Sequence, residues 1–99
     1  MERAIHFAKH GWKFGVADPI AYEQMADTFM FASMNSDTRE CTRPNSIDRL
    51  RLDFIATHFG VANVNPDYLK TFYPVNPRKL TRHGGCAGFF AYECARVNL

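Results

Sequence analysis

Four side chains suited to proton transfer and phosphate binding occur close together early in the chain, namely His6, Lys9, His10 and Lys13. Histidine can give and take a proton near neutral pH, and a neighbouring lysine attracts an anion and stabilises developing negative charge. His6 and His10 are four residues apart, which on a helix places both imidazoles on one face, a spacing that zinc sites also use. The cluster therefore favours acid–base chemistry at a phosphate, with metal binding and an ordinary polar helix end as alternatives.

A zinc site would need two more ligands, and the remaining candidates show no spacing typical of ligands. The three cysteines are an odd number without a C-x-x-C pair, which argues against a disulfide framework and against a zinc knuckle. We therefore expect no metal and no cofactor. We also expect three reduced, partly buried thiols, with one disulfide and one free thiol as the alternative. The remaining candidate ligands are His58, His83, Cys41, Cys86 and Cys94.

Two pairs of polar side chains are expected on strand faces. The arginines alternate with leucines, so both guanidinium groups lie on one face, where they either grip phosphates in a forked geometry or form a solvated surface. Two hydroxyl groups share a face of a later strand, although strands favour these residue types in any case. The pairs are Arg49 with Arg51, and Thr71 with Tyr73.

Helical patterns come first along the chain. Residues 2–9 can form a short helix that ends at Gly11. Asp18 followed by Pro19 is a strong helix start, since the aspartate caps the helix and proline suits its first position. Apolar residues at helical spacing then predict a second helix over 19–33.

Strand patterns follow the helices. Alternating apolar residues predict strands over 47–54, 58–64 and 68–75, with an edge strand over 38–43. Residues 87–97 fit either a closing strand or a short helix. The expected fold class is α+β, with N-terminal helices packed as one layer on an antiparallel β-sheet meander of about four strands.

Composition limits the architecture and the partners. A chain of 99 residues with 46% hydrophobic side chains fits a single domain over 1–99. The sequence contains no apolar run of about 18 residues and no secretion signal, so we expect no membrane partner. Residues 70–99 contain five basic residues and one acid, which favours a polyanion such as nucleic acid or else a solvated basic surface.

Several short motifs, taken in order, resemble one family. They are H-F-x-K-H-G-x-x-F-G at 6–15, D-P-x-x-Y from Asp18, R-L-D-F-I-A-T-H-F-G-V at 51–61, L-K-T-F-Y-P at 69–74 and Y-E-C-A-R-V at 92–97. Together they resemble the cytotoxic ribonuclease domains of the barnase, EndoU, colicin and RelE-like fold, in particular colicin D-like tRNA-cleaving toxins and the toxin domains of contact-dependent inhibition systems. The sequence departs from the family's hairpin pattern at Phe54 and at Ala56-Thr57.

The resemblance implies roles for individual residues. His10 matches the principal acid–base group, Lys9 would stabilise the phosphate, and Thr71 would contact or orient it. His6 and Arg51 rank next as proton-transfer or phosphate-binding partners, followed by Tyr73. Contacts to the RNA backbone that make affinity depend on salt are assigned to Lys13, Arg78, Lys79 and Arg82.

The resemblance also implies a reaction and a setting. A metal-independent endoribonuclease of this kind cleaves RNA, here tRNA, by attack of the 2′-hydroxyl, leaving a 2′,3′-cyclic phosphate and a 5′-hydroxyl. It would be delivered from a bacterial producer cell within a larger effector and act in the target-cell cytoplasm. Its partners would be a cognate immunity protein and, in some systems, a translation elongation factor. The alternatives are a non-catalytic RNA- or protein-binding module of the same fold, and a small zinc protein built on His6 and His10.

Overall fold

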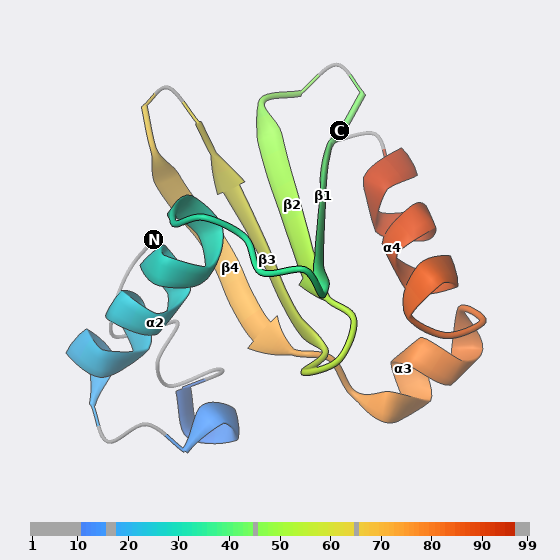
Figure 1. Cartoon of the computed structure of the whole chain (residues 1–99), viewed down its shortest axis with the longest axis horizontal. Coiled ribbons are helices and arrows are strands. Elements are labelled where there is room, and N and C mark those ends of the chain that lie inside the picture. The colour runs from blue at the N-terminus through green and yellow to red at the C-terminus, as the bar shows by residue number, and fades with distance from the viewer. Residues whose placement is uncertain (1–10, 16–17, 45, 65, 97–99) are drawn as a thin grey trace.

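The structure is a computed structural model that describes residues 11–15, 18–44, 46–64 and 66–96 (Figure 1). The predicted helix over 2–9 lies outside these ranges, as do His6, Lys9 and His10. The elements are a 3₁₀ turn η1 (Gly11–Phe14), helix α2 (Pro19–Phe31), strands β1 (Thr38–Thr42), β2 (Asp48–Asp53), β3 (His58–Asn63) and β4 (Tyr68–Pro74), and helices α3 (Pro77–Arg82) and α4 (Cys86–Ala95).

The strands form one four-stranded antiparallel meander in the order β1-β2-β3-β4. The α+β class and all four predicted strands are confirmed, each strand ending within a residue of its expected limits. A tight turn joins β2 to β3, where the Asp53 carboxylate accepts hydrogen bonds from the backbone N–H groups of Ile55 and Ala56, each at 2.8 Å. Thr57 completes this turn in the left-handed region, with φ of 58°.

Helix α2 begins as the sequence predicts. Oδ1 of Asp18 accepts a hydrogen bond from the Ala21 N–H at 2.8 Å, and Pro19 is the first helical residue. Side chains spaced four residues apart, namely Tyr22, Ala26 and Met30, are fully buried against the sheet. The helix ends at Phe31, two residues before the predicted limit.

The C-terminal segment is helical, which resolves the alternative left open by its sequence. Helix α4 follows Gly85, whose φ of 92° suits glycine. It packs on the sheet face opposite α2, and Figure 1 shows the two helices on opposite sides. The expected packing of the N-terminal helical layer on the sheet is confirmed, and α4 adds a second helical layer that the sequence did not predict, because β2 buries side chains on both of its faces.

Two apolar cores result, one on each face of the sheet. Alternation along each strand sends successive side chains to opposite sides, so each face receives its own apolar set. The core beneath α2 contains Tyr22, Ala26, Met30, Ala62, Leu69 and Phe72. The core beneath α4 contains Leu50, Leu52, Phe59, Val61, Val75 and Phe89.

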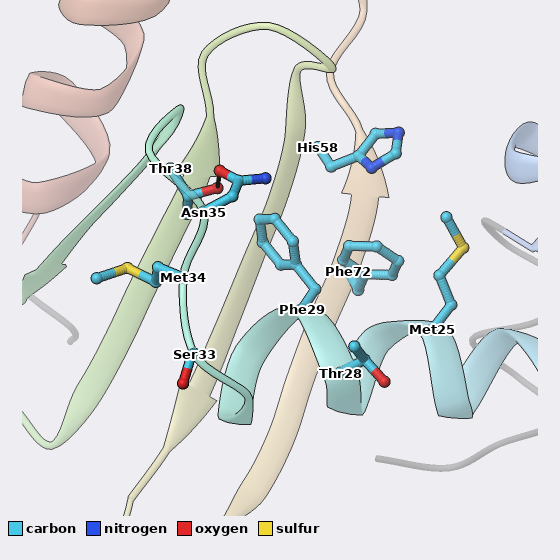
Figure 2. Close-up of a pocket in the computed structure, with 9 residues that line it drawn as sticks. All are labelled: Met25, Thr28, Phe29, Ser33, Met34, Asn35, Thr38, His58 and Phe72. Carbon is cyan, nitrogen blue, oxygen red and sulfur yellow. Dashed lines mark hydrogen bonds between the residues drawn. The ribbon is translucent and has the colours of Figure 1, made fainter.

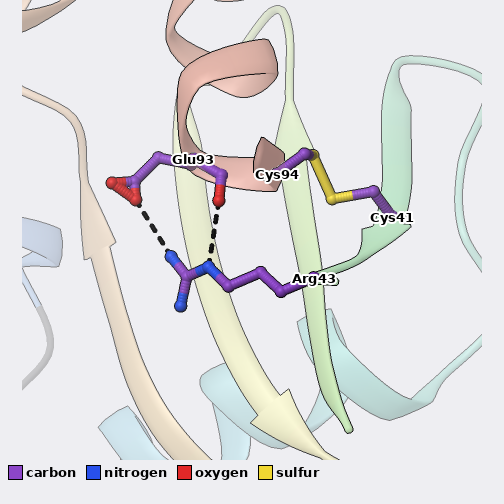
Figure 3. The surroundings of a disulfide bond; sticks show 4 residues. All are labelled: Cys41, Arg43, Glu93 and Cys94. Atoms are coloured by element: carbon purple, nitrogen blue, oxygen red, sulfur yellow. Dashed lines mark hydrogen bonds and ion pairs between the residues drawn. A yellow bond between two sulfur atoms is a disulfide. The ribbon is translucent and has the colours of Figure 1, made fainter. Parts of the chain in front are cut away.

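A disulfide bond joins Cys41 on β1 to Cys94 on α4, and Cys86 is free (Figure 3). The expectation of three reduced thiols is therefore wrong, and the alternative of one disulfide and one free thiol is correct. The pairing requires α4 to lie over this face, which brings the two Cα atoms within 6.1 Å. None of the helices in the described ranges has the length and apolar composition needed to cross a membrane.

Candidate functional site

A pocket of about 280 Å³ opens on the α4 face of the sheet, and we name it the basic pocket. It brings together three residues that the sequence had singled out, Thr71, Tyr73 and Lys79. Four cationic side chains surround these hydroxyl groups and two apolar residues form the floor. The lining residues are Arg43, Phe59, Val61, Lys70, Thr71, Tyr73, Lys79, Glu93 and Arg96.

An irregularity in β4 places two consecutive polar residues at this pocket. Val61 pairs with Thr71 while Ala62 pairs with Leu69, so Lys70 is the extra residue of a bulge. Its ammonium group lies 3.1 Å from Oδ1 of Asp48 on the same face. The bulge therefore adds a cation beside the predicted threonine.

Five charged groups form a continuous network along the pocket. Arg43 contacts Glu93 at 3.1 Å and Asp48 at 3.4 Å, while Lys70 and Arg96 pair with the same two carboxylates from the outside. The carboxylate side chains are only 2% and 3% exposed, whereas Lys70 is 35% and Arg96 is 55% exposed. The buried groups are mainly negative and the accessible ones positive, so the pocket presents its positive charge to solvent.

Tyr73 and Lys79 form the remaining polar part of the pocket. The Lys79 ammonium group lies 3.3 Å from the Tyr73 hydroxyl oxygen and 5.4 Å from the ring centroids of both Tyr73 and Phe89. Burial, followed by the negative charge of Glu93, raises the pKa of Tyr73 to about 12. The phenol therefore stays protonated at neutral pH and can act as a hydrogen-bond donor but not as a base.

Arg51 lies on the opposite face of the sheet from Thr71. Its side chain donates to Oε1 of Glu40 at 2.8 Å and to the carbonyl oxygens of Phe29 and Ala32 at 3.1 and 2.7 Å. Arg49 reaches the same helix end through the Met30 carbonyl at 3.3 Å, which confirms that the two arginines share a face. The structure thus does not bring Arg51 and Thr71 to one surface.

The other predicted RNA contacts lie outside the basic pocket. Arg78 and Arg82 are exposed on α3, and Lys13 is exposed on η1 beside a hollow of about 330 Å³ formed with residues 74–77. His6, Lys9 and His10 lie outside the described ranges, so the predicted proton-transfer group stays a prediction.

Sequence reasoning missed Arg43, Lys70, Glu93 and Arg96 as neighbours in one pocket. The basic excess of residues 70–99 was a signal for Lys70 and Arg96. No comparable signal existed for the pairing of Arg43 with Glu93, because the two residues are 50 positions apart and meet only when α4 docks (Figure 3).

A second pocket, of about 270 Å³, lies on the α2 face, and we name it the aromatic pocket (Figure 2). The sequence had considered His58 only as a metal ligand, yet its ring lies 4.8 Å from that of Phe14 and 5.9 Å from that of Phe72. Burial lowers the pKa of His58, and the nearby Asp53 charge opposes this shift. The lining residues are Met25, Thr28, Phe29, Ser33, Met34, Asn35, Thr38, His58 and Phe72.

Comparison with family models, curated proteins and solved structures found no match to this chain. Among the residues that the structure describes, no group of three or more His, Cys, Asp or Glu is placed to hold a metal ion. The zinc alternative involves His6 and His10, which lie outside those residues.

Proposed function

We propose that this chain is a metal-independent endoribonuclease of the bacterial toxin type that holds RNA phosphates in the basic pocket. The observation that supports the proposal is the convergence of accessible cations on Thr71 and Tyr73. RNA suits such a site because its own 2′-hydroxyl can attack the adjacent phosphorus, so the protein needs only a base, an acid and groups that stabilise the phosphate.

Each pocket side chain has a role in this proposal. As the 2′-hydroxyl attacks, negative charge grows on the phosphoryl oxygens, and Lys79 together with the protonated Tyr73 hydroxyl would stabilise it. Thr71 would orient the phosphate from the sheet. Proton transfer is assigned to His10, with His6 and Lys9 as its neighbours, and this assignment rests on the sequence resemblance alone.

The proposal extends to substrate and partners. tRNA is the proposed RNA, and the proposed inhibitor is a cognate immunity protein that presents acidic groups to the basic pocket. The domain would reach a target-cell cytoplasm as part of a larger effector. Any assistance from a translation elongation factor belongs to the same proposal.

Cleavage of total tRNA in EDTA tests the enzymatic proposal. The wild-type protein should produce fragments with 2′,3′-cyclic phosphate and 5′-hydroxyl ends, and His10→Ala and Thr71→Ala should each lose at least about 100-fold in rate. Arg39→Ala, which removes an exposed arginine of β1 away from the pocket, is the matched control. Intact tRNA with the wild-type protein, or equal cleavage by His10→Ala, would exclude the proposed chemistry.

Binding of single-stranded RNA tests the basic pocket separately from cleavage. If Lys70 and Lys79 each contact one phosphate, replacing either by alanine should reduce the slope of log affinity against log salt by about 0.7. Arg39→Ala should leave the slope unchanged. If all three variants give the same slope of log affinity against log salt, the basic pocket is not part of the RNA interface.

A non-catalytic RNA-binding module is the second candidate. It is favoured by one observation: among the described residues, the lining of the basic pocket includes no histidine, and its carboxylate Glu93 is paired with Arg43 and Arg96. This candidate predicts the same salt-dependent binding without new RNA ends. Cleavage assays on the RNA that binds therefore separate the two candidates.

A further inference from the structure

We propose that the aromatic pocket binds one uncharged heteroaromatic ring of the nucleobase type, as a second ligand site on the sheet face opposite the basic pocket. The site extends the proposed function to base recognition, and it can be tested without any phosphate or any cleavage. The inference comes from the chemistry of the pocket walls, from the polar groups at its rim and from its charge.

Flat and polarisable side chains form the walls. The partly exposed rings are those of Phe29 on α2 and His58 on β3, with centroids 6.5 Å apart. Phe72 on β4 lies behind them, fully buried, 5.2 Å from Phe29 and stacked on Phe14. Figure 2 shows these three rings gathered on one side, with Met25 beyond them along α2. Aromatic and thioether groups pack well against the faces of planar rings, and proteins bind unpaired bases by such stacking.

Polar groups lie on another flank of the pocket. The segment after α2 contributes Ser33 and Asn35, and Thr28 adds a hydroxyl from the helix. The Asn35 amide is held in place, since its Oδ1 accepts hydrogen bonds from Oγ1 of Thr38 at 2.9 Å and from the Asp37 N–H at 3.0 Å. A ligand with an apolar face and a hydrogen-bonding edge uses both flanks, whereas an aliphatic ligand leaves the polar flank unused.

Among the residues that the structure describes, the lining of the aromatic pocket carries no formal charge. Its nine residues include no lysine, arginine, aspartate or glutamate, and burial lowers the pKa of His58, which keeps the imidazole neutral at pH 7. A phosphate or carboxylate would find no cation among these nine residues. The volume of about 270 Å³ is below that of drug-sized sites, which fits one ring system.

The two pockets share strand β4, which lies at one edge of the four-stranded sheet. Phe72 faces the aromatic pocket, and its neighbours Thr71 and Tyr73 face the basic pocket. Only one strand therefore separates a site for a base from a site for a phosphate. This arrangement suits a nucleotide chain that places a base on one face of β4 and a phosphate on the other.

NMR titration of the full chain with adenosine, cytidine and uridine tests the site. Nucleosides carry no phosphate, and about 0.5 M NaCl suppresses any contribution of the basic pocket. We expect saturable shifts of the Met25 and Met34 methyl signals and of the His58 ring, with one nucleoside preferred. The absence of saturable shifts up to about 10 mM for all three would overturn the proposal, as would equally tight binding of cyclohexanol.

Two variants and a control locate the binding. Phe29→Leu should weaken binding by about fivefold or more through lost stacking. Thr28→Val, at an exposed position of α2, should change the preference among the nucleosides. Tyr92→Leu removes a half-exposed aromatic ring from α4 and should have no effect. Equal weakening by Tyr92→Leu and Phe29→Leu would show non-specific stacking and overturn the assignment.

Binding of a trinucleotide shows whether the ligand ring belongs to an RNA strand or to a free nucleoside. If the base belongs to an RNA strand, a trinucleotide at lower salt should bind more tightly than its nucleoside, and Lys79→Ala should remove this gain. If a free nucleoside is the ligand, the two should bind equally. If nucleosides bind while tRNA stays intact, the ring-binding site is supported and the proposed cleavage is excluded. A failure of the ring-binding site can therefore be distinguished from a failure of the proposed cleavage.

Discussion

On both faces of the sheet an arginine side chain binds the covering helix, but the packing around the two arginines differs. On each face an arginine from the sheet side donates to carbonyl oxygens near the end of a helix. Arg51 does so to Phe29 and Ala32 at the end of α2, and Arg43 does so to Glu93 in α4. An arginine at this place satisfies carbonyl groups that the helix itself leaves unpaired.

The surroundings differ in what supports the arginine. Helix α2 buries Tyr22, Ala26 and Met30, so apolar packing holds most of it. Helix α4 buries only Phe89 and the charged Glu93, and the Cys41–Cys94 bond supplements this small contact. The comparison teaches that a helix with little apolar contact can be kept on a sheet by ion pairs and a covalent link.

The largest expected effect is the loss of the disulfide. The bonded cysteines are 53 positions apart, and closing a loop of that length in the unfolded chain corresponds to about 4 kcal/mol of stability. The Cys41→Ser/Cys94→Ser variant should lose about this much free energy of unfolding in urea, and a thiol reductant should have the same effect on the wild-type protein. Cys86→Ser is the control and should remain sensitive to the reductant. An unchanged midpoint on reduction would contradict the comparison.

The two arginines provide the next test. Arg43→Leu leaves two carboxylates, only 2% and 3% exposed, without their shared partner and should cost about 3 kcal/mol. Arg51→Leu leaves Glu40, which is 32% exposed and can be solvated, and should cost about 2 kcal/mol through the lost carbonyl bonds. Urea unfolding of both variants measures the difference. A larger loss of unfolding free energy for Arg51→Leu than for Arg43→Leu would contradict the conclusion that the α4 face depends more on ion pairs.

A smaller effect is expected where α2 touches the sheet most closely. A Cβ atom at Gly60 would lie 2.5 Å from Sδ of the fully buried Met30. Gly60→Ala should therefore cost about 1–2 kcal/mol through overpacking. Adding Met30→Leu, which shortens the side chain and so relieves this contact, should recover part of the loss in a double-mutant cycle. Additive effects of the two substitutions would show that the contact is not what limits the site.

The smallest effect is the pH dependence of the α2 face. Because the folded state lowers the pKa of His58, the unfolded chain takes up a proton first as the pH falls below 6.5. Stability should thus be complete above that value and decline toward the lowered folded pKa. His58→Gln should flatten the curve below pH 6.5, the ordinary pKa of histidine. An equal decline in His58→Gln would assign the effect to other groups.

The sequence was sufficient to predict helices and strands that are marked by local signals. It was insufficient to predict contacts that form only when a helix packs on the sheet. Asp18 and Pro19 mark the start of α2, and alternation marks β2, because capping and strand burial act over a few residues. Thr71 and Tyr73 share a face as predicted, because they are two residues apart on β4, whereas the contact of Lys79 with Tyr73 depends on helix α3, which the sequence did not predict. The disulfide and the Arg43–Glu93 contact depend on which face α4 covers, and the alternation of β2 did not reveal that both faces are covered.

The disulfide also determines whether the unfolded chain can pass through a narrow opening as a single strand. With the Cys41–Cys94 bond intact, the residues between them form a closed ring that contains β2, β3, β4 and α3. A passage that admits one extended strand at a time cannot take this ring in single file, since two segments must enter side by side. Any route into a cell through such a passage therefore requires the bond to be reduced beforehand or formed only after arrival.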